Sequence, residues 1–127
     1  MSQADEGWHT GTFAGTTYRY YCSKPTNSKP WTILFHGHPG CTHSWHRTVP
    51  FLQSKGYGII MPDMLGYGGT DKPLDVQAYR ASKVVESVDA LITEVIKNEA
   101  EKRVIAIGMP FTRLKVGSHY NYRTRLG

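Results

Sequence analysis

Three short apolar segments, separated by helical patterns, constrain the fold of this chain more than any other feature. Residues 31–35, 57–61 and 103–107 are runs rich in aliphatic and aromatic side chains, as expected for strands that are covered on both faces. Strands that alternate with helices share a parallel sheet with right-handed crossovers. The sequence therefore predicts an α/β fold in which these three strands are neighbours in one parallel sheet.

A helix is predicted in each interval between these strands. Ser44 is expected to cap the first, over residues 45–54, with a break or restart at Pro50 and an end at Gly56. The second covers residues 84–96, where apolar side chains recur at helical spacing. It should pack on the sheet through one apolar face, which consists of Val88, Leu91, Ile92 and Val95.

The chain divides into three parts of unequal character. Residues 1–7 are expected to be a disordered N-terminus, residues 8–108 the folded core, and residues 109–127 an aberrant basic tail. Within the core, residues 10–16 and 17–22 are rich in threonine and tyrosine and flank a glycine, which predicts a β-hairpin ahead of the parallel sheet. A length of 127 residues suits one domain and is too short for two ordinary ones.

Composition predicts an intracellular, cytoplasmic location and no membrane partner. The first residues contain neither a basic nor an apolar leader segment, which argues against secretion. No apolar stretch reaches the length of a membrane span. The two cysteines, Cys22 and Cys41, fit a reduced protein better than a disulfide framework. The sequence leaves open whether a lost C-terminus carried a targeting signal.

The net charge of +5 is concentrated in the tail. Residues 1–108 contain 11 Lys and Arg against 10 Asp and Glu, a balance of +1. The tail has no acidic residue and contributes the remaining +4 through Arg113, Lys115, Arg123 and Arg125. Isolated basic tails are usually solvated, so no nucleic-acid partner is expected.

Two motifs follow the first two parallel strands. His36-Gly37-His38-Pro39 comes directly after residues 31–35, and such a turn can aim the backbone N–H of His38 into a cleft as half of an oxyanion hole. Farther along, residues 62–73 read Pro-Asp-Met-Leu-Gly-Tyr-Gly-Gly-Thr-Asp-Lys-Pro. Together the two motifs resemble the N-terminal half of the α/β-hydrolase superfamily, and most closely its epoxide-hydrolase-like branch.

This resemblance implies the N-terminal part of an α/β-hydrolase fold and, in an intact relative, hydrolysis of a small apolar epoxide or ester without a cofactor. It implies that the bond between His38 and Pro39 is cis. Asp63 corresponds to a loop organiser in the family and is not expected to be a catalytic acid. The positions that should shape the pocket and its loops are His36, Gly37, Pro39, Asp63, Gly66 and Gly68.

The expected nucleophile is missing from the sequence. In this superfamily the third strand leads into an elbow of the form Gly-x-nucleophile-x-Gly. Gly108 matches the first glycine, but Pro110 occupies the nucleophile's position and Thr112 that of the last glycine. Proline has no nucleophilic atom and a fixed φ, and no acidic residue follows Glu101. We therefore expect the chain to be an inactive remnant, truncated before the elbow.

Two other functions compete with this interpretation. A non-catalytic half-domain could associate with another chain, or with itself, through an exposed sheet edge at residues 104–107. A metal-binding protein is suggested by the Zn²⁺-ligand types gathered at His36, His38, Cys41, His43 and His46. However, the turn motif accounts for the first two histidines, and Pro39 and Gly40 interrupt any helical register. No metal site is therefore expected.

Overall fold

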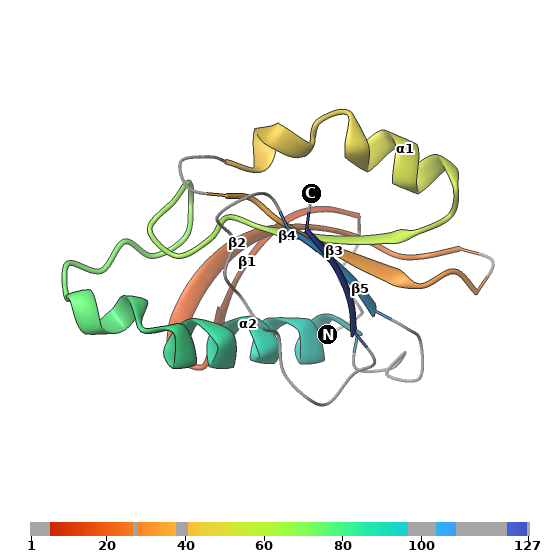
Figure 1. Cartoon of the computed structure of the whole chain (residues 1–127). Coiled ribbons are helices and arrows are strands. Elements are labelled where there is room, and N and C mark those ends of the chain that lie inside the picture. Colours follow the sequence, from red (N-terminus) through yellow and green to blue (C-terminus); the bar gives the residue numbers. More distant parts are fainter. Residues whose placement is uncertain (1–5, 27, 38–40, 97–103, 109–121, 127) are drawn as a thin grey trace.

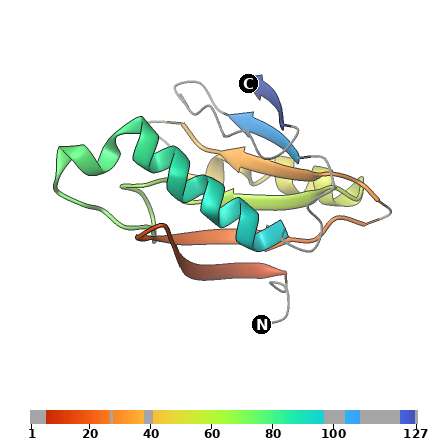
Figure 2. The ribbon, with the colours of Figure 1, turned by 90° about the horizontal axis from the view of Figure 1, so that it is seen from below.

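The computed structural model describes residues 6–26, 28–37, 41–96, 104–108 and 122–126. One six-stranded sheet forms the centre of this part, in the order β1-β2-β4-β3-β5-β6. Helix α1 lies over one face of the sheet and α2 over the other (Figures 1 and 2). The strands are β1 (Gly7–Phe13), β2 (Thr16–Ser23), β3 (Trp31–Phe35), β4 (Gly58–Pro62), β5 (Val104–Gly108) and β6 (Tyr122–Leu126). The helices are η1 (Thr42–Trp45), α1 (Thr48–Ser54), η2 (Val76–Tyr79) and α2 (Ala81–Ile96), of which η1 and η2 are 3₁₀ helices.

The predicted parallel sheet is confirmed. Strand β3 pairs in parallel with β4 on one side and with β5 on the other, and each strand begins within a residue of its predicted start. Trp31 lies opposite Gly58 in this register. A Cβ atom at Gly58 would lie 2.8 Å from the Trp31 ring and 2.7 Å from Pro25, so the indole occupies space that only a glycine leaves open.

The N-terminal hairpin is also confirmed, but β1 lies three residues earlier than the predicted segment 10–16, and β2 extends one residue beyond the predicted segment 17–22 at each end. Strand β1 pairs antiparallel with β2 from Gly7–Cys22 to Phe13–Thr16, and β2 pairs antiparallel with β4. Ala14 and Gly15 connect the two strands with φ values of +48° and +83°. Positive φ at both central residues is the mark of a type I′ turn, whose twist matches that of the flanking strands.

The prediction of one helix capped by Ser44 is wrong. Ser44 lies inside η1, and α1 starts only at Thr48. Pro50 is the third residue of α1, in the first turn, where its missing N–H costs no bond within the helix. The interruption therefore falls before Pro50 and not at it. Gly56 follows the helix with a φ of +87°, as predicted for the residue that ends it.

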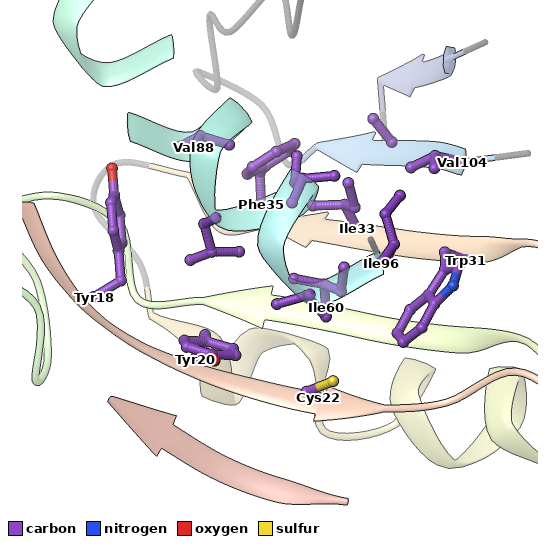
Figure 3. Packing of buried hydrophobic residues seen from close by; sticks show 14 of the residues in the cluster. Tyr18, Tyr20, Cys22, Trp31, Ile33, Phe35, Ile60, Val88, Ile96 and Val104 are labelled. Carbon is purple, nitrogen blue, oxygen red and sulfur yellow. The ribbon is translucent and has the colours of Figure 1, made fainter. Parts of the chain in front are cut away.

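The main hydrophobic core lies between the sheet and α2. The predicted apolar face of the helix is confirmed, since Val88, Leu91 and Ile92 are completely buried. In Figure 3, Val88 and Ile96 lie against side chains of the central strands. A buried hydrogen bond of 2.7 Å joins the Tyr18 hydroxyl to Ser87 Oγ. Ser87 donates its own proton to the Val84 carbonyl, so Tyr18 is the donor in that bond.

The predicted exposed edge at β5 is wrong. Strand β6 pairs with it in parallel along all five residues, from Val104–Tyr122 to Gly108–Leu126, and forms the edge of the sheet opposite β1 in Figure 2. The backbone of β6 takes up the N–H and C=O groups that β5 would otherwise present to a partner. Five residues of the predicted tail therefore belong to the sheet. In the part of the chain that the structure describes, no helix has the length and apolar character needed to cross a membrane.

Leu91 offers a direct test of the core. We expect Leu91→Ala to lower the free energy of unfolding by about 2–5 kcal/mol, because it leaves a cavity under the sheet. Leu74 is 99% exposed, so Leu74→Ala should change stability by less than about 0.5 kcal/mol. Urea denaturation followed by circular dichroism measures both. Equal losses in the two variants would contradict the described packing of α2.

Cys22 and Cys41 should differ sharply in reactivity. Burial raises the pKa of the Cys22 thiol from 9.0 to about 12, and Lys24 offsets this only in part. Since the thiolate is the reactive form, only exposed Cys41 should react with Ellman's reagent at about pH 8 in the folded protein. Two rapidly reacting thiols in the native protein would contradict the burial of Cys22. The Cys41→Ser variant should show none before unfolding and one after it.

The raised pKa of the Cys22 thiol also affects the stability of the protein at high pH. On raising the pH, the unfolded chain loses the Cys22 proton before the folded protein does. The contribution of this thiol to the free energy of unfolding is therefore full below about pH 9 and decreases as the pH rises toward about 12. Above pH 9, Cys22→Val should show a shallower loss of stability than the unaltered chain.

Candidate functional site

The candidate site lies where the parallel strands end. Phe35, the last residue of β3, pairs with Gly108, the last residue of β5, and β4 ends beside them at Pro62. The carboxyl ends of parallel strands meet at one edge of a sheet, which is where α/β proteins bind their ligands. The topology therefore brings His36, Gly37, the loop after β4 and Gly108 to the same edge.

His36 ties the end of β3 to this loop. Its ring is buried, and Nε2 accepts a 2.9 Å hydrogen bond from the backbone N–H of Met64. A nitrogen that accepts from N–H is unprotonated, so the ring is neutral and Nδ1–H donates to the Gly37 carbonyl at 3.0 Å. Tyr67 packs edge-to-face against the ring, with the centroids 4.9 Å apart. The histidine predicted to shape the turn is thus fixed by contacts on both of its nitrogens.

Asp63 directs its carboxylate into its own loop. The residue is 2% exposed, and Oδ2 accepts a 2.9 Å bond from the Gly69 N–H. The Arg19 guanidinium lies 3.4 Å from the same oxygen. In addition, the Thr70 hydroxyl donates to the backbone carbonyl of Asp63 at 2.6 Å and accepts from the backbone N–H of Arg19 at 3.0 Å. The carboxylate is occupied by groups that organise the loop, which leaves it poorly placed for acid–base chemistry.

Two glycines of the loop need the left-handed backbone region. Gly66 and Gly68 have φ values of +91° and +52°, which side chains disfavour. At Gly68 a Cβ atom would also lie 2.3 Å from Asp63 Oδ2, and at Gly66 it would lie 3.1 Å from the Tyr79 ring. The path of the loop therefore favours glycine, the residue without a Cβ atom, at the two predicted positions. A role of this loop in shaping a substrate pocket belongs to the proposal below.

Sequence reasoning missed Arg19. This residue lies on β2, 44 positions before its partner Asp63, inside a hairpin whose pattern shows only alternation. Its guanidinium also lies 3.8 Å from the centre of the Trp8 ring. Arg19 is therefore held by both a carboxylate and an aromatic face, and it joins the hairpin to the loop after β4.

The remaining predicted site residues lie outside the described residues. These are His38 with the proposed oxyanion N–H, Pro39 with the proposed cis bond, and Pro110 at the nucleophile's position. The described residues contain no group of three or more His, Cys, Asp or Glu side chains that could hold a metal ion. His43 and His46 stack at 4.6 Å, and His46 Nδ1 lies 2.9 Å from the His43 carbonyl.

Comparison with known proteins shows the family to which the fold corresponds. A family model described as the alpha/beta hydrolase fold matches residues 30–102. Epoxide hydrolase A of Mycobacterium tuberculosis is 35% identical over 66 residues, which cover 52% of this chain and 20% of that protein. A haloalkane dehalogenase of Mycobacterium marinum is 30% identical over 81 residues, which cover 64% of this chain and 27% of that protein. The chain thus spans between 20% and 27% of the length of these two curated relatives.

Solved structures show the same fold. Epoxide hydrolase A from Mycobacterium thermoresistibile matches with a TM-score of 0.68 at 24% identity, over 83% of this chain and 31% of that one. Epoxide hydrolase I of potato matches with a TM-score of 0.70 at 25% identity, over 80% of this chain and 31% of that one. Most of the present chain therefore corresponds to about a third of each of these structures.

The loop after β4 should depend on the buried carboxylate. We expect Asp63→Ala to lower the free energy of unfolding by about 1–3 kcal/mol, because the Gly69 N–H loses its buried acceptor. Asp75 is the matched control, since its carboxylate accepts from the Gln77 N–H at 2.9 Å on an exposed surface. Asp75→Ala should cost less than about 1 kcal/mol, because water replaces the bond. Equal losses in urea denaturation would show that burial of Asp63 does not matter.

Proposed function

Because the chain belongs to the alpha/beta hydrolase fold family, we propose that it forms the oxyanion-hole side of an epoxide-hydrolase-like enzyme. In this proposal the complete enzyme hydrolyses a small apolar epoxide or ester, and the present 127 residues do not catalyse by themselves. The observation that carries the proposal is the meeting of His36, Gly37 and Gly108 at the carboxyl edge of the sheet. The similarity to epoxide hydrolases supports it.

The proposed oxyanion donor is the backbone N–H of His38. His36 is held by Met64 on one ring nitrogen and by the Gly37 carbonyl on the other, and these bonds anchor the two residues that precede position 38. A donor held in place before the reaction stabilises developing negative charge without reorganisation. The Met64 carbonyl in turn accepts a 2.9 Å hydrogen bond from the Tyr67 N–H in the same loop, which gives that loop a positioning role in the proposal.

The chemistry also needs a nucleophile and a base. In an epoxide hydrolase of this type, a carboxylate attacks one oxirane carbon, the C–O bond breaks, and the electron pair moves to oxygen, where the oxyanion donors and an acid receive it. A histidine base then activates the water that cleaves the ester. These are protein groups, so the proposed reaction needs no metal or cofactor.

The present residues lack that nucleophile. Pro110 stands at the elbow position, and no Asp or Glu follows Glu101. Asp63 does not fit this role, since the residue is 2% exposed and its Oδ2 atom is held by Gly69 and Arg19. Binding and one oxyanion donor alone leave out the covalent and acid–base contributions that supply most of the rate.

Purified chain incubated with styrene oxide and with phenyl acetate tests this proposal. We expect product formation at the rate of buffer alone, and Pro110→Asp should stay inactive because the base is still absent. The exposed thiol of Cys41 can be alkylated once by an epoxide, so the Cys41→Ser variant separates this single event from turnover.

Multiple turnovers by the unaltered chain would overturn the proposed inactivity. If that turnover disappears in Ser118→Ala or His119→Ala, the catalytic groups lie among residues 109–127. Circular dichroism spectra of all variants serve as the control for folding.

A further inference from the structure

One edge of the sheet lacks the usual protection against pairing with another strand. Strand β1 forms this edge, opposite β6 (Figure 2), and among the described residues it pairs with β2 alone. Proteins commonly protect an edge strand with charged side chains, proline or a bulge. The seven residues of β1 include no Asp, Glu, Lys, Arg or Pro, and their register with β2 is continuous, without a bulge. The strand therefore lacks all three of these devices.

Strand β2 shows which way the backbone groups of the hairpin point. The Thr17 N–H donates to Asp71 Oδ2 at 2.9 Å, and the Thr17 carbonyl accepts from the Asp71 N–H at 3.0 Å. The Arg19 N–H donates to Thr70 Oγ1 at 3.0 Å, and its carbonyl accepts from the Asp63 N–H at 2.9 Å. Both residues of β2 thus direct their backbone groups away from β1, toward the side of β4.

The opposite residues on β1 must therefore direct their own groups outward. Thr12 lies opposite Thr17, and Thr10 lies opposite Arg19, so both are non-hydrogen-bonded pairs of the antiparallel ladder. Because these pairs alternate along a strand, Trp8 belongs to the same set. The N–H and C=O groups of Trp8, Thr10 and Thr12 point away from β2, along the outer edge of the sheet.

These outward groups are arranged symmetrically about Thr10. When two copies of β1 pair antiparallel with Thr10 opposite Thr10, Trp8 of each copy lies opposite Thr12 of the other copy. Each of these is a hydrogen-bonded pair that exchanges both of its N–H···O=C bonds, so the register uses every outward group of both strands. A shift of the register by two residues moves one of the pairs beyond the ends of β1. The edge is therefore complementary to a second copy of itself.

Side chains and charge favour the same register. Trp8 is 43% exposed and would lie beside Thr12 of the other copy, and such pairs of an aromatic with a β-branched residue stabilise antiparallel sheets. Thr10 would face Thr10 of the other copy, which is also a favourable pair. Of the net charge of +5, residues 109–127 contribute +4, and β6, the described part of that segment, forms the opposite edge. The excess positive charge therefore does not oppose pairing at β1.

We propose that two copies of this chain associate through β1, antiparallel and about a twofold axis at Thr10, which joins their sheets into one continuous sheet. The interface is isologous, so pairing uses the β1 edge of both copies and the assembly closes as a dimer. This inference does not rest on hydrolase activity, because no residue of β1 belongs to the proposed catalytic edge.

Sedimentation velocity of the purified chain from about 10 µM to about 1 mM, the range of weak association, tests the proposal. We expect a dimer that dissociates on dilution. Thr10→Pro removes an outward N–H at the twofold axis, and the edge of a sheet accepts proline there because β2 does not use that N–H. Two hydrogen bonds are lost per dimer, so the dissociation constant should rise about tenfold or more. Thr10→Val keeps the N–H and the β-branched shape, so it is the matched control and should dimerise normally.

A pair of cysteine variants tests the register. In the Cys41→Ser background, where the remaining Cys22 is buried, Thr10→Cys should form a disulfide-linked dimer in a glutathione redox buffer. The two Cα atoms at the axis would lie about 5.5 Å apart, which a disulfide spans. Thr12→Cys is the control, because its two copies would lie about 13 Å apart along the strands, beyond the reach of a disulfide.

A chain that sediments as a monomer throughout this range would overturn the proposal. A dimer that Thr10→Pro does not weaken would place the association on another surface, and equal cross-linking of Thr10→Cys and Thr12→Cys would exclude the proposed register. The unaltered chain and the two cysteine variants test the proposal even if Thr10→Pro does not fold, which circular dichroism would show.

Discussion

The pairing of β3 with a parallel strand on each side is the constraint on which the rest of the structure depends. β3 is buried along its whole length, so its backbone N–H and C=O groups need partners from β4 and β5. Parallel pairing forces each connection to cross a face of the sheet. The two connections place α1 on one face and α2 on the other (Figure 1), and they bring three strand ends to a single edge.

At that edge, the two side chains that resemble catalytic groups, an imidazole and a carboxylate, already make hydrogen bonds within the protein. His36 is held between Met64 and Gly37, and Asp63 is held by Gly69 and Arg19. Groups that are satisfied in this way give a rigid frame and little reactivity. The described part of the edge is therefore a scaffold on which a reaction could be arranged, and its own carboxylate and imidazole serve to hold backbone in place.

The sequence predicts the features that depend on local pattern. Continuous apolar runs fix the three central strands, and helical spacing fixes the buried face of α2, because each pattern reports burial directly. The helix start predicted at Ser44 is wrong because tertiary packing outweighs the capping preference of serine. Trp45 is buried against the sheet, and the chain forms a 3₁₀ helix there. Arg19 and β6 depend on partners outside their own segments, 44 positions away for Arg19 and in the preceding strand β5 for β6, and no local pattern encodes such a partner. The sequence motif identifies the loop glycines. The structure explains why glycine is needed there, because a Cβ atom would approach Asp63 at one position and Tyr79 at the other.

The contact between Trp31 and Gly58 limits which substitutions this sheet can accept. A large ring on one central strand lies over a glycine on the next, and Pro25 closes the same space from the loop. The two positions thus share one fixed volume across a pair of strands. A side chain at position 58 becomes tolerable only when position 31 shrinks and Pro25 moves aside. Natural variation at these three positions should therefore be correlated. A larger side chain on one strand should accompany a smaller one on its neighbour, so that the total side-chain volume is conserved.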